Sequence, residues 1–203
     1  MKTTRGYVLL AGALLYLPAT SLTAGEPASD LMETEFVDGG KITIELSAGE
    51  HQISESGDNT IRVYWRVGDE HDLDVVDAVT EVDGSTAEIE LDGPRNNFET
   101  LIKVPRNSDL TIKLSAGELS VDGVVGSKDV HLRAGELSIE VGDTDDYAHV
   151  EGSLWAGDID AGPFDEAKSG LFRSIEWHGD GQHELKFKLY AGDVRLYTRE
   201  AEN

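Results

Sequence analysis

The chain has 203 residues, no cysteine and a formal net charge of −23, from 40 acidic and 17 basic residues. The acidic excess opposes binding to nucleic acid or to an anionic membrane, because phosphate contacts require the opposite charge. Without cysteine there is neither a disulfide framework nor a lipidated cysteine, so stability must come from apolar burial and backbone pairing.

The first 24 residues are typical of a cleavable secretory signal peptide. Lys2 and Arg5 precede an apolar run over residues 7–19, and the small residues at 21–24 offer a cleavage site. The run is too short to span a membrane and is interrupted by glycine and proline. We therefore expect a periplasmic or secreted protein with no membrane insertion after cleavage. Loss of the two cations would change the net charge from −23 to −25.

The rest of the chain is predicted to be a single β domain over residues 41–197. A flexible lead-in over residues 25–40 is expected before it, and a polar tail over residues 198–203 after it. Within the domain, residues 41–108 are expected to be an irregular or sandwich-like β part, and residues 109–197 a regular one. Alternation of apolar and polar residues predicts strands in the first part at Ile42–Leu46, Ile61–Val67, Thr86–Leu91 and Thr100–Pro105, with Leu73–Val82 a further strand because of its valine content.

In the second part, two alternating runs are predicted to form a hairpin. These are Gly170–Trp177 and Glu184–Tyr190, which flank a turn at His178–Gly181. Pro163–Lys168 is the one segment of this part where a helical turn is expected.

One short phrase occurs five times along the chain. It reads Leu-x-Ala-Gly-acid-Φ-x-Φ, where Φ is usually apolar, and its copies begin at Leu46, Leu114, Leu132, Leu154 and Leu189. Its weakest matches are His51 and Ala161, each at a Φ position. Repetition of this kind indicates a repeat architecture.

The phrase contains a slip in its alternation. Ile112 and Leu114 have even numbers, whereas Leu119 and Val121 have odd ones, so the slip lies at Gly117 and the acid after it. A flat strand would then direct apolar side chains into water, so a bend with positive φ at glycine is expected. Short strands joined by bends, repeating every 18 to 22 residues, predict the stacked rungs of a β-solenoid, about 4.8 Å apart. A β-sandwich with an incidental repeated turn is the competing architecture.

Stacked rungs would place equivalent apolar residues in inward ladders. The expected ladders are Leu114, Leu132 and Leu154; Leu119, Leu137 and Ile159; and Val121, Ile139 and Ala161.

The run Val104–Gly126, followed by Val130–Ile139, resembles the bacterial domains named "putative adhesin", or DUF4097-type domains. In that family a Val-Pro lead precedes repeated Gly-acid-Φ-x-Φ units. The resemblance covers Thr100–Gly162 well, and it implies a β-solenoid and export. It implies no catalytic residue.

The phrase also supplies candidate metal ligands. Glu118, Glu136 and Asp158 would stack as a ladder of carboxylates, which is a weak calcium candidate; otherwise the carboxylates accept backbone N–H bonds or face solvent. The turns Asp143–Asp146 and Gly179–Gly181 are further calcium candidates. His178 and His183 form a candidate transition-metal pair if the turn between them brings them together; the alternative is a plain exposed hairpin. No other cofactor is expected.

Trp155 is the candidate contact residue, because it occupies an outward position of its phrase, whereas Trp65 is expected in the core. No nucleophile elbow, phosphate loop or dinucleotide fingerprint is present in the sequence. We therefore expect a non-enzymatic protein that binds, adheres or scaffolds in the cell envelope, through a protein or glycan partner. The alternative is a polysaccharide lyase or hydrolase on a β-helix-like fold.

Overall fold

The computed structural model describes residues 28–68 and 70–199. The signal peptide predicted for residues 1–24 lies outside the described residues, as does the chain from residue 200 onward. The described part is all-β, with one sheet of 13 strands and three short 3-10 helices. No helix in these residues is long and apolar enough to cross a membrane.

The strands follow one another closely along the chain. They are β1 (Ala28–Glu35), β2 (Lys41–Leu46), β3 (Gly49–Glu55), β4 (Thr60–Val67), β5 (Asp77–Asp83), β6 (Thr86–Asp92), β7 (Glu99–Val104), β8 (Asp109–Leu114), β9 (Gly117–Asp122), β10 (Lys128–Glu140), β11 (Tyr147–Ala161), β12 (Glu166–His178) and β13 (His183–Tyr197). The 3-10 helices are η1 (Glu70–Val75), η2 (Thr144–Asp146) and η3 (Gly162–Phe164).

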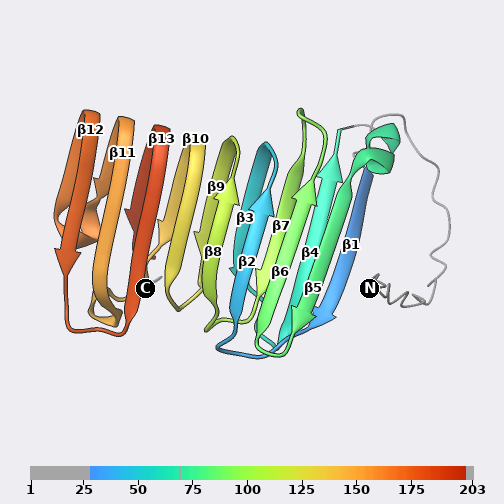
Figure 1. The fold of residues 1–203 in the computed structure, drawn as a ribbon, viewed down its shortest axis with the longest axis horizontal. Coiled ribbons are helices and arrows are strands. Elements are labelled where there is room, and N and C mark those ends of the chain that lie inside the picture. Colours follow the sequence, from blue (N-terminus) through green and yellow to red (C-terminus); the bar gives the residue numbers. More distant parts are fainter. Residues whose placement is uncertain (1–27, 69, 200–203) are drawn as a thin grey trace, which may run out of the picture.

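The sheet is folded over into two layers with the apolar core between them (Figure 1). One layer contains β5, β6, β2 and β8, and the other contains β1, β4, β7, β3 and β9. The long strands β10 to β13 continue both layers, because β10 pairs with β8 through its first half and with β9 through its second. The bends between the layers lie along the top of Figure 1.

Glycine makes these bends possible, as the slip in the phrase predicts. Gly135 in β10 has φ +135°, and Gly117, Gly157 and Gly192 have φ between +123° and +135°. A Cβ on Gly135 would also overlap the carbonyl oxygen of Gly117 on the neighbouring strand. The bend therefore needs glycine for its dihedral angle and for the close approach of stacked backbones.

Parallel pairing keeps the phrases in register from strand to strand. Leu114 lies beside Leu132, as predicted, but Leu132 then lies beside Leu189, and Leu189 beside Leu154. The expected contact between Leu132 and Leu154 is therefore wrong, and the other two ladders are corrected in the same way. The reason is topological, since β13 lies between β10 and β11 although it follows both in the chain.

The first half of the chain belongs to the same stack and is not a separate irregular part. β2 pairs in parallel with both β6 and β8, and β3 pairs in parallel with both β7 and β9. The expected lead-in over residues 25–40 is also corrected. Its residues 28–35 form β1, which pairs with β4 over its whole length.

Three local predictions need correction or refinement. The expected hairpin of β12 and β13 is wrong, because β12 pairs with β11 alone and β13 lies on the other side of β11. Leu73–Val82 divides into η1 and β5, so only its second half is a strand. The helical turn expected near Pro163 is η3, Gly162–Phe164.

His51, the exception to the apolar Φ position, is buried as a neutral side chain. Its Nε2 donates to the Ser47 carbonyl at 3.2 Å, its Nδ1 accepts from the Thr100 hydroxyl at 2.9 Å, and its ring meets Phe98 edge-on. Burial lowers the pKa of His51 to about 4, against the opposing effect of the Ser47 hydrogen bond. The imidazole thus fills a core position while both of its nitrogens have partners.

Gly135→Ala is expected to lower the free energy of unfolding by about 2–4 kcal/mol, because the new Cβ meets a strained dihedral and a neighbouring backbone. Gly84→Ala is the matched control, since Gly84 has φ +59° but open space around its Cα. The control should lose only about 1 kcal/mol. Urea denaturation measures both values, and equal losses would contradict the stacking argument.

His51→Gln is expected to remove part of the acid sensitivity of the fold. The folded-state pKa of about 4 lies below the unfolded value near 6.5, so the unfolded chain binds the extra proton between these pH values. Stability from this site is therefore complete above pH 6.5 and falls as the pH approaches 4, by about 1–3 kcal/mol. Urea denaturation of the wild type and of His51→Gln at pH 7 and pH 4.5 tests this. An equal decrease in the free energy of unfolding of both proteins between the two pH values would rule it out.

Candidate functional site

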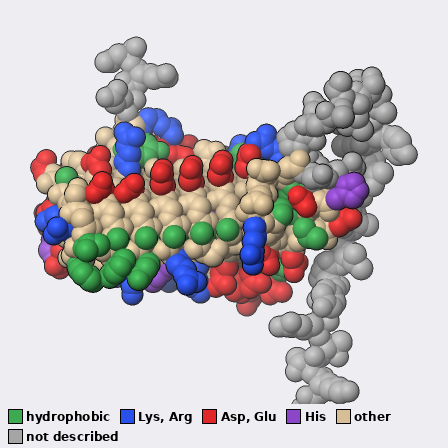
Figure 2. Space-filling model, turned by 90° about the horizontal axis from the view of Figure 1, so that it is seen from above, with side chains coloured by type: hydrophobic (Ala, Val, Ile, Leu, Met, Phe, Trp, Pro, Cys, Tyr) green, Lys and Arg blue, Asp and Glu red, His purple; other side chains and the backbone are tan. Residues whose placement is uncertain are grey.

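The acids of the phrases form a continuous row along the bends. Figure 2, which looks onto the bends, shows acidic side chains in line beside a line of hydrophobic ones. The strand registers give the order of the phrase carboxylates along the row as Glu50, Glu118, Glu136, Asp193 and Asp158, and Glu99 of β7 extends the row beside Glu50.

The predicted carboxylate ladder is therefore partly right in its membership. Glu118 and Glu136 are neighbours, but Asp158 lies beside Asp193 instead of Glu136. Asp193 accepts a hydrogen bond from the Asp158 backbone N–H at 3.0 Å, which is the alternative role considered for these acids. The carboxylates are mostly exposed, and calcium binding by them stays a prediction.

The two turns considered for calcium have local hydrogen bonds of their own. Asp143 caps η2 by accepting from the Asp145 backbone N–H at 3.0 Å. In the other turn, the backbone N–H of Gly179 donates to Ala148 and that of Gly181 donates to Tyr147. These bonds account for the Asp and Gly residues as turn formers.

The structure does not pair His178 with His183. His178 stacks on His149, with ring centroids 4.6 Å apart, whereas His183 meets the ring of Tyr147 edge-on. The strand order explains the difference, because β11 separates β12 from β13.

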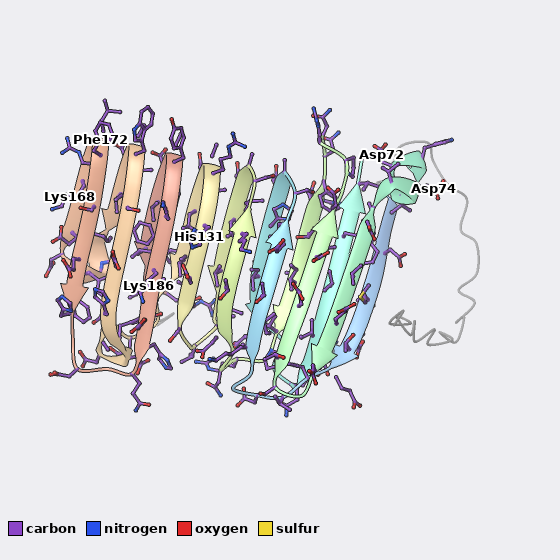
Figure 3. All side chains as sticks on the ribbon, in the orientation of Figure 1. Asp72, Asp74, His131, Lys168, Phe172 and Lys186 are labelled. Atoms are coloured by element: carbon purple, nitrogen blue, oxygen red, sulfur yellow. The ribbon has the colours of Figure 1, made fainter. Side chains whose placement is uncertain are left out.

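Trp155 belongs to an exposed aromatic cluster. Its ring stacks on Tyr190 at a centroid distance of 4.7 Å and an interplanar angle of 3°, and it meets Phe172 at 5.7 Å and 87°. Trp155 is 41% exposed, Tyr190 56% and Phe172 73%. Hydrophobic side chains gather accordingly at the β11–β13 end in Figure 2, and Phe172 projects from β12 in Figure 3.

The repeat places these rings together. Arg133, Tyr190 and Trp155 all occupy the x position of the phrase, which is the last outward position before the bend. The register of β10, β13 and β11 puts the three side chains in one row, and Phe172 on β12 extends it. Further along the stack the same position holds Ser115. The row thus becomes aromatic toward the β12 end.

Basic side chains surround the aromatic cluster. Arg133 and Lys188 line a shallow groove of about 580 Å³ together with the three rings, and His131 lies at its side. Arg173 lies directly opposite the core residue Leu154, so its side chain is on the other face of β12, where its Nε donates to the Ser169 carbonyl. Within residues 28–68 and 70–199, neither of the cations Arg133 and Lys188 has a carboxylate at ion-pair distance. By contrast, Lys113, one strand beyond, is paired with Glu45 at 2.6 Å. We call the five residues Trp155, Tyr190, Phe172, Arg133 and Lys188 the aromatic–basic patch.

Sequence reasoning found only one member of this patch. Trp155 was recognisable as an outward residue of the phrase, and Trp65 is buried, as expected. Tyr190 and Arg133 carry the same signal, because they occupy the same x position, but their contact depends on β13 lying beside β11. Phe172 lies on the antiparallel edge strand β12, which contains no copy of the phrase.

Comparison with known proteins finds no matching family model and no match among curated proteins. A solved structure of a putative cell adhesion protein from Clostridium sporogenes ATCC 15579 has a TM-score of 0.59 and 12% identity, over 86% of this chain and 100% of that one. A putative adhesin from Parabacteroides distasonis ATCC 8503 has a TM-score of 0.30 and 13% identity, over 85% and 71%. At this identity, the likeness to the Clostridium protein shows a shared fold and nothing further.

Proposed function

We propose that this protein is a non-enzymatic, exported adhesion protein that binds an acidic glycan of the cell envelope through the aromatic–basic patch. One observation carries the proposal, namely three exposed aromatic rings beside two cations without ion-pair partners, on a molecule that is otherwise strongly acidic. The repeated bends and matched registers support a β-solenoid with interleaved rungs as the scaffold, of the DUF4097 type that the sequence resembles.

The chemistry of the patch favours this ligand class. Aromatic rings offer apolar surface to sugar rings, and an exposed cluster of this kind is typical of an interaction surface. Arg133 and Lys188 would contact carboxylate or sulfate groups, and the Arg133 guanidinium is suited to a bidentate contact. The negative charge elsewhere would repel such a ligand, so binding would be confined to this end of the molecule.

Basic residues are few in this chain, but their placement in the patch matters more for binding an acidic ligand than their number. The net charge of the whole sequence opposes an anionic ligand, whereas the patch brings cations from two strands, β10 and β13, into one groove. No carboxylate lines this groove in the described residues, which supports binding over acid–base hydrolysis at the patch.

The double variant Trp155→Ala/Tyr190→Ala is expected to weaken glycan binding at least about tenfold, because it removes the central stacked pair. Arg133→Ala and Lys188→Ala should each weaken it about threefold to tenfold and reduce its salt dependence. Lys113→Ala is the matched control, since Lys113 lies outside the patch and is paired with Glu45.

The measurement is calorimetric titration with acidic and neutral polysaccharides at two salt concentrations. Unchanged binding by the double variant would contradict the proposal. Turnover of any polysaccharide, lost on removal of a carboxylate pair, would favour the enzyme alternative instead.

A further inference from the structure

A second group of side chains lies on the same outer face, farther from the bends. His149 is in β11, and Glu176 and His178 are in β12, where His149 is the direct cross-strand partner of His178. Val150 beside His149 is buried, so the alternation of the strand turns His149 outward. Glu176 and His178 are two residues apart and therefore share that face.

The three side chains converge on one point. His178 Nε2 lies 3.2 Å from Glu176 Oε1, and His149 Nε2 lies 3.8 Å from the same oxygen. One ligand atom from each residue lies within 4.8 Å of the others. The two imidazole rings are parallel within 2°. Antiparallel strand pairing thus presents two imidazole nitrogens and a carboxylate oxygen to a common position.

His149 has a polar atom without a partner. Its Nε2 is buried and makes no hydrogen bond, although the edge of the ring points toward the Glu176 carboxylate. A buried nitrogen that lacks a partner is unfavourable, and coordination to a cation would satisfy it. This feature separates His149 from His178, whose Nε2 has Glu176 at hydrogen-bond distance.

We propose that His149, Glu176 and His178 form a binding site for a divalent transition metal ion, with Zn²⁺ as the reference ion. Two imidazoles and one carboxylate suit Zn²⁺, Cu²⁺ or Ni²⁺, whereas Ca²⁺ and Mg²⁺ prefer oxygen ligands alone. Ligand atoms about 2.1 Å from a tetrahedral ion lie about 3.4 Å from each other. Ligand atoms up to 4.8 Å apart therefore need to approach each other by about 1.4 Å or less. The side chains of Glu176 and His178 are exposed and free to make this movement.

The surroundings of the site attract a cation. Glu151 is the cross-strand neighbour of Glu176, and Glu184 on β13 is the neighbour of His149. Lys186 forms an ion pair with Glu184 at 2.6 Å, so the uncompensated negative charge beside the site comes mainly from Glu151. Three protein ligands leave one coordination position for water or for an atom of a bound partner.

The test is calorimetric titration of the untagged protein with Zn²⁺ alone at pH 7.5. The expected result is one ion per chain, with affinity lowered at least tenfold by His178→Ala and about tenfold by Glu176→Gln. His183→Ala and His131→Ala are matched controls that should leave the affinity unchanged. His149→Ala should act like His178→Ala; because His178 is an exposed residue, its variant decides the matter if His149→Ala does not fold.

Co²⁺ provides an independent readout. The visible absorption of a tetrahedral Co²⁺ ion should appear in the wild type and be absent in His178→Ala. Millimolar Ca²⁺ should not displace Zn²⁺. Loss of binding in His183→Ala with retention in His178→Ala, full competition by Ca²⁺, or equal Zn²⁺ affinity in all variants would each overturn the proposal.

Discussion

Backbone pairing between parallel strands at the glycine bends governs the rest of this structure. At each bend the chain passes from one layer to the other, and the carbonyl of one glycine occupies the space that a Cβ on the next would need. This close approach favours the observed register, in which equivalent residues of the copies of the phrase lie beside one another. The apolar columns between the layers follow from this register, and each fully buried leucine or isoleucine in them contributes about 1.5–3 kcal/mol.

The same register orders the outer surface. A position that recurs in the phrase becomes a line of neighbouring side chains, so like residues accumulate along the stack. The acid after each glycine becomes a row of carboxylates, whose mutual repulsion is weakened by water to about 1 kcal/mol per pair. The x position becomes a row that changes from serine to arginine to aromatic residues. Such rows bring together side chains of one chemical kind that lie far apart in the sequence.

The sequence predicted much of this fold and less of its surface. The apolar positions change from even to odd residue numbers at Gly117. This change was enough to predict the bends, because apolar side chains must remain inside. The position of β13 between β10 and β11 leaves no trace in residue spacing, since Leu132, Leu154 and Leu189 are equivalent in the phrase. The stacking of Tyr190 on Trp155 depends on that position and was missed. The stacking of His178 on His149 was missed for another reason, because β12 was expected to pair with β13 whereas it pairs with β11. Trp155 alone was identified, because outward placement is a local property.

The interleaving of β13 has a consequence for the way the molecule assembles. A stack whose segments follow chain order can grow from one end, each new segment adding to a finished surface. Here the place between β10 and β11 is filled by β13 (residues 183–197), which follows β11 and β12 in the chain. In the part of the chain that the structure describes, β11 and β12 pair with the rest of the sheet through β13 alone. The sheet is therefore completed by long-range pairing of β13 with β10 and β11, and such pairing is slow in general. Insertion of β13 joins the β11–β12 pair to the other strands.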